Sequence, residues 1–244
     1  AIQAGQAVAA SFGQASLFAD ENGEDERIVN WKKAERWDDR KLYTLERDAF
    51  GFCLTGDMFD PYRVEARNFA VPFKDVRDSR EQQTIAGIVQ SVRTITGKRG
   101  NFGVVVLSDG QTTMDVLVFS RAYESYKHML KADEMLIFVG KGRKDERSGG
   151  MSFVCDEVLT IEQMRVRKGA TLMLELTDGK GLKTLVEVLQ AGQNNEIGGV
   201  SCEVSIRSNG VKAEMYLKNG YIPSDQLLNQ LRNSDSVASA KFVY

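Results

Sequence analysis

The chain is poor in the residues that most often build metal centres, disulfide frameworks and hydrolytic sites. Its 244 residues contain one histidine, His128, and three cysteines that lie far apart with no C-x-x-C pair. This spacing argues against both a zinc site and a disulfide framework. A Ser-His-Asp or Cys-His hydrolase would depend on that one imidazole, and no G-x-S-x-G motif accompanies it. Isolated cysteines are typical of a reducing compartment, so we expect a cytoplasmic protein.

The chain also has little that would direct it to a membrane. No apolar run approaches the roughly 18 residues that a membrane-spanning helix needs. Residues 1–10 have neither a basic start nor a strong apolar core, so they do not resemble a signal peptide. We therefore expect no membrane partner.

Motifs for nucleotide chemistry are missing as well. The sequence has no G-x-x-x-x-G-K-[ST] loop and no G-x-G-x-x-G between a strand and a helix, which removes the common nucleotide-binding folds. The nearest carboxylate pairs, Asp38 with Asp39 and Asp109 with Asp115, are not spaced to converge on two metal ions. We predict no catalytic residue, no metal and no cofactor in this chain.

The charges of the chain nearly balance. Lysine and arginine number 32 against 34 aspartates and glutamates, which gives a net charge of −2. A protein whose main task is to grip a long duplex is normally basic. Any nucleic-acid contact must therefore be local.

The first third of the chain reads as a flexible segment followed by a helical linker. Residues 1–30 are small, polar and acidic, which favours a mobile segment. Residues 31–79 form the linker, with a helix that begins after its N-cap Asp38 and ends before Gly56. A turn is expected at Asp60-Pro61. The apolar residues that recur at helical spacing, and are expected to face a core, are Leu42, Leu45, Ala49 and Phe52.

Two folded domains follow, which makes the fold class α+β. In residues 80–164, strands are expected at 84–96, 102–107, 113–119, 135–140 and 151–161, with a helix at 121–133 between the third and fourth. This order is the plan of an OB-fold, a small Greek-key barrel. After a basic joint at 165–169, the rest of residues 165–244 reads β-α-β-β-α-β, the ferredoxin-like order. Its strands are expected at 171–176, 200–206, 211–217 and 237–244. Leu182, Leu185, Val186 and Leu189 form the stripe of its first helix.

The predicted barrel concentrates basic residues where OB-folds bind single strands. Such barrels use the loop between strands 1 and 2, the loop between strands 4 and 5, and the face of strands 2 and 3. Phe102, Phe119 and Phe153 could stack on bases, although for any single one of them packing inside the barrel is the favoured interpretation. The basic candidates in or near the two loops are Arg93, Lys98, Arg99, Lys141, Arg143, Lys144 and Arg147.

A short apolar pair lies inside the polar N-terminal segment. Leu17 and Phe18 end the pentapeptide QASLF at residues 14–18. Burying both on a partner is worth about 3–6 kcal/mol, and ordering the five residues costs about 1 kcal/mol each or more. The peptide therefore binds weakly alone and is useful beside other contacts. Packing of the pair on its own domain is an equal alternative.

These residues together resemble the C-terminal region of the alpha subunit of bacterial DNA polymerase III, a replicative polymerase. The matching runs occur in the same order over nearly the whole chain, at residues 14–18, 45–56, 98–101 and 223–232. The chain departs from the family at Asp57 and Met58, where histidine and proline are usual, and at Gly97 in place of threonine. These departures leave the pentapeptide intact.

The resemblance implies a non-catalytic recruitment region of a DNA-directed DNA polymerase, whose catalytic carboxylates lie in another part of the subunit. Gln14, Ser16, Leu17 and Phe18 would bind the sliding clamp. The barrel would bind single-stranded template DNA. The last domain would bind the tau subunit of the clamp loader, and the rest of the polymerase subunit is a further partner. Candidates for the contact with tau, if they are not core residues, are Leu227, Leu228 and Leu231.

Two other interpretations remain open from the residues. The chain could be a stand-alone OB-fold protein that binds RNA or tRNA, which clamp affinity would argue against. It could also be an unrecognised enzyme, which metal-dependent nucleotide incorporation or hydrolysis would reveal.

Overall fold

The computed structural model describes residues 37–97, 100–144, 150–177, 182–192, 199–208, 211–234 and 236–244. Its contacts separate residues 1–37 from one compact unit, residues 38–244. The predicted domain boundaries after residues 30, 79 and 164 stay predictions. The pentapeptide at 14–18 lies outside the described residues, as do Lys98, Arg99 and Arg147.

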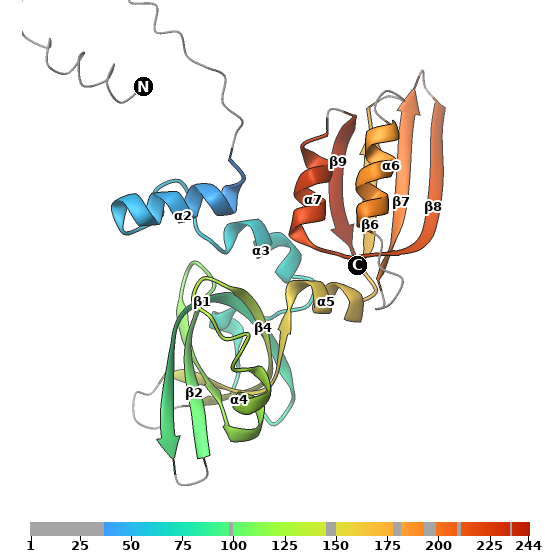
Figure 1. The fold of residues 1–244 in the computed structure, drawn as a ribbon. Coiled ribbons are helices and arrows are strands. Elements are labelled where there is room, and N and C mark those ends of the chain that lie inside the picture. Colours follow the sequence, from blue (N-terminus) through green and yellow to red (C-terminus); the bar gives the residue numbers. More distant parts are fainter. Residues whose placement is uncertain are drawn as a thin grey trace, which may run out of the picture. The chain divides into compact units, whose positions relative to one another are not determined.

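Five strands close into a barrel in the order β1-β2-β3-β5-β4, and helix α4 lies between β3 and β4 in the chain (Figure 1). This confirms the predicted OB-fold. The elements are β1 (Gln83–Gly97), β2 (Gly100–Ser108), β3 (Thr113–Val118), α4 (Ser120–Tyr126), β4 (Met135–Lys144) and β5 (Met151–Thr160).

Helix α4 is shorter than the predicted helix at 121–133. It ends at Tyr126, and the chain then turns, with Asp133 in the left-handed region at φ 68°. Ala122, Tyr123 and Tyr126 of the helix pack on the barrel core, and the turn that follows carries Met129 and Leu130 there as well. The amide of Asp133 donates to the carbonyl of Val89 and leads the chain into β4.

Two helices of the linker pack on the outside of the barrel wall. Helix α2 (Asp39–Phe50) begins where predicted, because the Asp38 carboxylate accepts a hydrogen bond from the Lys41 amide at 2.7 Å. It ends at Gly51, five residues before the predicted stop, in a left-handed conformation at φ 81° that glycine adopts without strain. Buried side chains of the linker and of the barrel wall form one cluster, which includes Tyr43, Phe59, Tyr62, Ala86 and Ile137.

The predicted apolar stripe of α2 is confirmed only at Leu42, which packs against the cluster of Tyr43 and Tyr62. Leu45 and Phe52 are exposed, whereas Tyr43 and the carboxylate side chain of Glu46 are buried. Glu46 is satisfied there because its carboxylate accepts from the amides of Leu54 and Thr55, at 2.7 and 3.0 Å, and from the Thr55 hydroxyl at 2.8 Å.

The predicted turn at Asp60-Pro61 is also wrong, because a second linker helix, α3 (Asp60–Ala66), begins there. Proline is tolerated in a first helical turn, where its missing N–H has no intrahelical partner. Asp57 accepts a hydrogen bond from the Phe59 amide at 2.8 Å, and Met58 is buried. The departures from the family at these two positions therefore serve the start of α3. A single 3₁₀ turn, η1 (Phe73–Asp75), then leads to the barrel.

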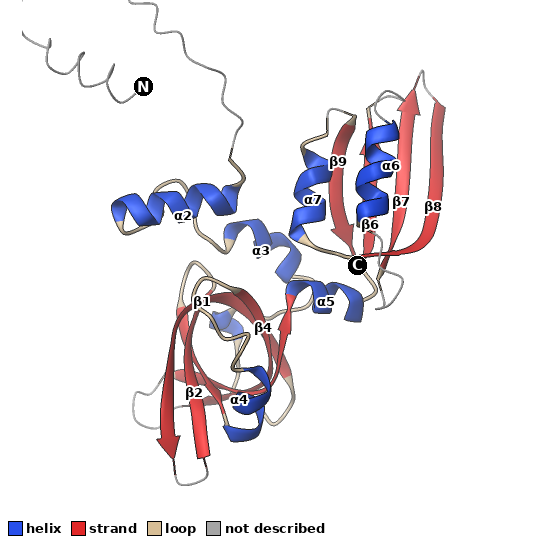
Figure 2. Cartoon of the chain, viewed as in Figure 1, coloured by secondary structure: helices blue, strands red, loops and turns tan. Residues whose placement is uncertain are grey.

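The C-terminal lobe follows the predicted order of elements. Its four-stranded sheet carries two helices on one face (Figure 2), and Leu172, Leu174, Leu185 and Leu231 are buried between the layers. Val186, which was expected in this core, is 47% exposed. The elements are β6 (Thr171–Leu176), α6 (Leu182–Ala191), β7 (Val200–Ser208), β8 (Val211–Tyr221), α7 (Asp225–Arg232) and β9 (Val237–Val243).

The strand order of this sheet differs from the ferredoxin-like arrangement. The order is β8-β7-β6-β9, with β6 and β7 adjacent and parallel. In a split β-α-β unit a third strand separates the two parallel strands. Here the helix-facing apolar residues of β6 and β7 pair directly, Leu172 with Cys202 and Leu174 with Val204, so no strand separates them.

The expected basic joint at 165–169 is largely helical, and its first arginine is buried. Helix α5 (Ile161–Arg167) starts with a capping box between Thr160 and Gln163. Arg165 is 1% exposed and donates to both oxygens of Glu65 on α3, each at 2.7 Å. It also bonds the Pro223 carbonyl at 2.7 Å and Asp225 at 2.8 Å, and it lies 4.3 Å from the ring centre of Phe242.

Replacing Arg165 by methionine should strongly destabilise the unit of residues 38–244. The variant leaves Glu65 and Asp225 without their cation, and breaking a buried ion pair in this way costs about 3–5 kcal/mol. Urea unfolding followed by circular dichroism measures the loss. As a control, Arg167→Met removes a half-exposed pair with Glu157 and should cost at most about 1 kcal/mol. Equal losses in the two variants would contradict this role of Arg165.

The hydrogen bonds to Glu46 predict a pH dependence. The amide of Thr55, followed by its hydroxyl and the Leu54 amide, lowers the pKa of Glu46 below its ordinary value despite burial. The stabilisation is therefore present above the unfolded pKa of about 4.3 and is lost as the pH falls through the lower folded pKa. The difference in urea midpoint between the wild type and Glu46→Gln should shrink from about pH 6 to about pH 3. The exposed neighbour Asp48, changed to asparagine, is the control, and a pH-independent difference for Glu46→Gln would contradict the prediction.

Candidate nucleic-acid interface

The strand pairing aligns side chains in rows across the barrel. In one row, Arg93 of β1 lies opposite Val104 of β2, and Leu117, Val154 and Lys141 continue it across β3, β5 and β4. Paired residues project to the same face of a sheet. Arg93 and Lys141 are exposed and Leu117 is half-buried, so this row faces outward.

The neighbouring rows confirm this orientation. One step along the strands, Val105, Val116 and Phe153 are paired in register and completely buried in the barrel. Phe153 therefore has no exposed ring to offer a base, which removes it from the predicted interface. One further step in the same direction returns to the outward side, where Asp115 is paired with Ser152, which is paired with Arg143, and both charged residues are exposed.

Aromatic and aliphatic side chains lie on the same outward side. Phe102 is two residues from Val104 and half-buried, and its ring contacts that of Phe119 with centroids 5.7 Å apart. Phe119 is 47% exposed and Ile95, which pairs with Phe102, is 44% exposed. The name outer barrel face is used below for Arg93, Ile95, Phe102, Leu117, Phe119, Lys141 and Arg143.

The cations of this surface have no ion pair among the described residues, as is also true of other described cations such as Arg67, Arg121 and Lys241. Within the described ranges, Arg93, Lys141, Arg143 and the exposed Lys144 have no carboxylate within ion-pair distance. Elsewhere, six cations pair with carboxylates. This row crosses all five strands of a closed barrel, so it follows the curved outer wall, with Arg93 on β1 and Lys141 on β4. Among the described residues, the outer barrel face thus combines cations that have no ion pair with exposed apolar rings.

The sequence reasoning found most of this surface but missed two members. Ile95 and Leu117 were not identified as site residues. Alternation along the strand could have found Ile95, because it is two residues from Arg93 and so projects to the same side. Leu117 becomes visible only through the register of β2 and β3.

The three leucines proposed for partner contact are core residues. Leu227, Leu228 and Leu231 are 4%, 7% and 0% exposed and pack between α7 and the sheet. They were candidates for contact with tau only if they were not core residues. Because they pack in the core of the lobe, their side chains are not available to a partner.

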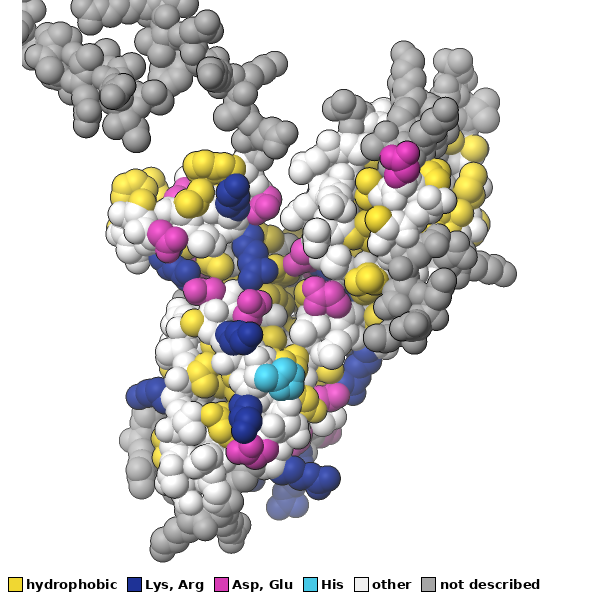
Figure 3. Space-filling view, viewed as in Figure 1, with side chains coloured by type: hydrophobic (Ala, Val, Ile, Leu, Met, Phe, Trp, Pro, Cys, Tyr) yellow, Lys and Arg dark blue, Asp and Glu magenta, His cyan; other side chains and the backbone are white. Residues whose placement is uncertain are grey.

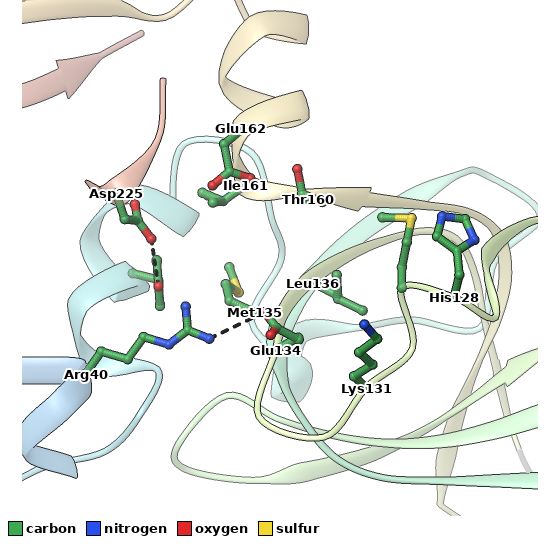
Figure 4. Close-up of a pocket in the computed structure, with 12 residues that line it drawn as sticks. Arg40, His128, Lys131, Glu134, Met135, Leu136, Thr160, Ile161, Glu162 and Asp225 are labelled. Atoms are coloured by element: carbon green, nitrogen blue, oxygen red, sulfur yellow. Dashed lines mark hydrogen bonds and ion pairs between the residues drawn. The ribbon is translucent and has the colours of Figure 1, made fainter. Parts of the chain in front are cut away.

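A separate pocket of about 210 Å³ contains the single histidine (Figure 4). Arg40 lies 3.4 Å from Glu134, and the Tyr62 hydroxyl donates to Asp225 at 2.8 Å. Burial, followed by the charge of Asp225, raises the pKa of Tyr62 above its ordinary value. His128 lies apart from these two pairs in the figure. In the part of the chain that the structure describes, no three histidine, cysteine or acidic side chains gather as a metal site would require.

The lengths and hydropathy of the described helices bear on whether any of them could cross a membrane. Of the residues that the structure describes, none belong to a helix long and apolar enough to cross a bilayer.

Comparison with known proteins identifies the barrel as an OB-fold and finds relatives that match nearly the whole chain. Residues 83–161 match the family described as OB-fold nucleic acid binding domain. DNA polymerase III subunit alpha of Escherichia coli O157:H7 is 30% identical over 236 residues, which cover 93% of this chain and 20% of the relative. The subunits of Neisseria meningitidis serogroup B and Pseudomonas aeruginosa are each 28% identical, over 91% and 96% of this chain and 20% of each relative.

Solved structures resemble smaller parts of the chain. A RecG structure bound to a three-way DNA junction shares 24% identity over 36% of this chain and 12% of its own, with a TM-score of 0.31. An asparaginyl-tRNA synthetase from Pyrococcus horikoshii shares 20% identity over 38% of this chain and 23% of its own, with a TM-score of 0.32. Scores this low add nothing to the assignment.

The sequence relatives, in contrast, match nearly all of the chain, and the chain spans about one fifth of their length. With an OB-fold nucleic-acid-binding domain at its centre, the chain is homologous to part of the alpha subunit of bacterial DNA polymerase III.

Proposed function

We propose that this chain is a non-catalytic recruitment region of a replicative DNA polymerase subunit, and that its barrel binds single-stranded template DNA. The support is the homology to DNA polymerase III subunit alpha together with the chemistry of the outer barrel face. Catalysis is assigned to other parts of the polymerase subunit. Nucleotide incorporation by this chain alone would contradict that assignment.

The observation that carries the proposal is the set of unpaired cations beside exposed rings. Proteins that bind single strands combine a positive surface along the phosphates with aromatic side chains on which bases stack. Arg93 and Lys141 lie at opposite ends of one row, and Phe102 and Phe119 lie on the same side of the barrel. Asp115 on this face disfavours phosphate near Arg143, so the row of Arg93 and Lys141 is the favoured path for the backbone.

Binding to single strands should depend on salt in proportion to the phosphates that these cations contact. Each cation on a single strand contributes about −0.7 to the slope of log K against log salt, so Arg93, Lys141 and Lys144 predict about −2 and a further contact by Arg143 would make it about −3. Fluorescence anisotropy with a labelled oligothymidine measures this slope. A slope near zero would contradict the proposed interface.

The variant Arg93→Gln/Lys141→Gln should weaken binding and reduce the size of that slope by about 1.4. Lys241→Gln, which removes an exposed cation of β9 in the other lobe, is the matched control and should leave the slope unchanged. Competition by an RNA of the same length tests the alternative of a stand-alone RNA or tRNA binder. A strong preference for RNA, without clamp affinity, would favour that alternative.

We also propose that residues 14–18 bind the sliding clamp. The support is the pentapeptide itself and its place in the run of segments shared with the polymerase subunit. Its anchors are the amide of Gln14 and the apolar pair Leu17 and Phe18, with Ser16 between them.

In a pull-down with purified clamp, Leu17→Ala/Phe18→Ala should lose binding. The expected loss is about 3–6 kcal/mol of apolar burial, which exceeds the net affinity of such a short peptide. The control, Val8→Ala in the same N-terminal segment, should bind as the wild type does. Undiminished clamp binding by the double variant would contradict the role of the pentapeptide.

The C-terminal lobe is proposed to dock the tau subunit of the clamp loader, on the resemblance alone. Because Leu227, Leu228 and Leu231 are buried, any such contact uses other residues of the lobe.

A further inference from the structure

An uncharged run at the end of α2 exposes large apolar side chains. Residues 49–56, AFGFCLTG, contain no charged residue. Phe50, Phe52 and Leu54 are 60%, 59% and 64% exposed, and Leu45 on the same helix is 38% exposed. These four residues are called the α2 apolar patch. Figure 3 shows hydrophobic side chains gathered on α2.

The backbone that carries the patch is held in place by buried contacts. The Glu46 carboxylate binds the amides of Leu54 and Thr55 and the Thr55 hydroxyl, which ties the segment after α2 back to the helix. Gly56 lies against Tyr43, since a Cβ built on it would be 2.5 Å from the tyrosine oxygen. The segment is therefore fixed with Phe52 and Leu54 outward, and they cannot fold back without breaking the bonds to Glu46.

The helix itself is fixed to the barrel. Arg47 binds both carboxylate oxygens of Asp133, and Arg40 lies 3.4 Å from Glu134, both partners being just ahead of β4. The patch thus has a defined position on the barrel rather than belonging to a loose loop. A fixed, exposed apolar patch marks an interaction site more often than a chance exposure.

The chemistry of the patch restricts its occupant. A run of eight residues without a cation offers nothing to phosphates, so nucleic acid is excluded as a partner here. Transient protein interfaces are about as polar as ordinary surface, whereas permanent ones are more apolar and depleted in charge. The patch therefore fits a permanent protein partner with an apolar contact surface.

We propose that the α2 apolar patch is an intramolecular docking surface for another part of the same polymerase polypeptide. This rests on the proposed function. About four fifths of the length of the relatives lies outside the part that this chain matches, and in each relative that portion is covalently joined to the matching region. A permanent apolar contact is what such a covalently joined partner provides.

Hydroxyl-radical footprinting read by mass spectrometry compares this 244-residue chain with the full polymerase subunit that contains it. Phe50, Phe52 and Leu54 should be oxidised at least fivefold more slowly in the full subunit. Val64 on α3, which is 75% exposed and outside the patch, is the internal control and should react equally in both. Equal oxidation of the patch in both proteins would overturn the proposal. Protection in the 244-residue chain that grows with its concentration would also overturn it, because the occupant would then be a second copy.

The variant Phe52→Ser/Leu54→Ser tests the same surface. In the full subunit it should restore oxidation of Phe50 to the level in the 244-residue chain, whereas Val64→Ser should not. In the 244-residue chain its urea midpoint should match the wild type, since both side chains are exposed. A large fall there would overturn the proposal by showing that they pack in their own unit.

The oligothymidine assay separates the two proposals. Single-strand binding by the 244-residue chain should be unchanged in Phe52→Ser/Leu54→Ser, so a failed footprint leaves the barrel interface standing. Conversely, a salt slope near zero would contradict the proposed function while leaving the protection of Phe50 to be measured independently.

Discussion

The buried guanidinium of Arg165 is the contact on which the unit of residues 38–244 depends. It is 1% exposed, and its partners come from α3, from the segment before α7, and from β9. A cation removed from water is tolerated only when its donors are satisfied, so these three elements must be present together. Glu65 is held from a second side as well, because Tyr244 at the end of β9 donates to it. The linker, the end of the barrel and the C-terminal lobe therefore meet at one ion-pair cluster.

The same accounting of charges explains how a protein with net charge −2 can offer a cationic surface. Arg40, Arg47, Arg63, Lys127, Arg165 and Arg167 are matched by nearby carboxylates and contribute little to the field outside. Arg93 and Lys141 lack such partners in the described chain, so their charge is available to a ligand. Local pairing, and not the total charge, decides where phosphates are attracted.

Sequence patterns predicted the elements well and some of their surroundings poorly. All five expected barrel strands are present, although only β3 alternates cleanly, because β1 and β4 are buried on both faces where the linker helices cover the wall. Of the stripe on α2 only Leu42 packs on the cluster, because helical spacing says which residues share a face, and not which face is covered. Tyr43 and Glu46 are buried, whereas Leu45 and Phe52 are exposed. The strand order of the C-terminal sheet and the rows of the outer barrel face depend on pairing between distant segments, which local patterns do not contain. The three leucines of α7, offered as a possible partner contact, pack in the core instead, because their regular spacing places them on the side that faces the sheet.

The outer barrel face and the α2 apolar patch differ in chemistry, and this difference indicates that they bind different ligands. The outer barrel face combines exposed rings with cations that have no ion pair among the described residues, whereas the α2 apolar patch leaves large side chains exposed in a run without charge. Departures from local consistency are expected where function is located. Phosphates cannot stabilise the patch, and an apolar protein surface cannot satisfy Arg93 and Lys141, so one ligand cannot serve both. Both surfaces are fixed to the same barrel, and occupying one therefore positions the other. Weak contacts joined in this way act as intramolecular ones, which is how a small domain can hold single-stranded DNA near a larger machine.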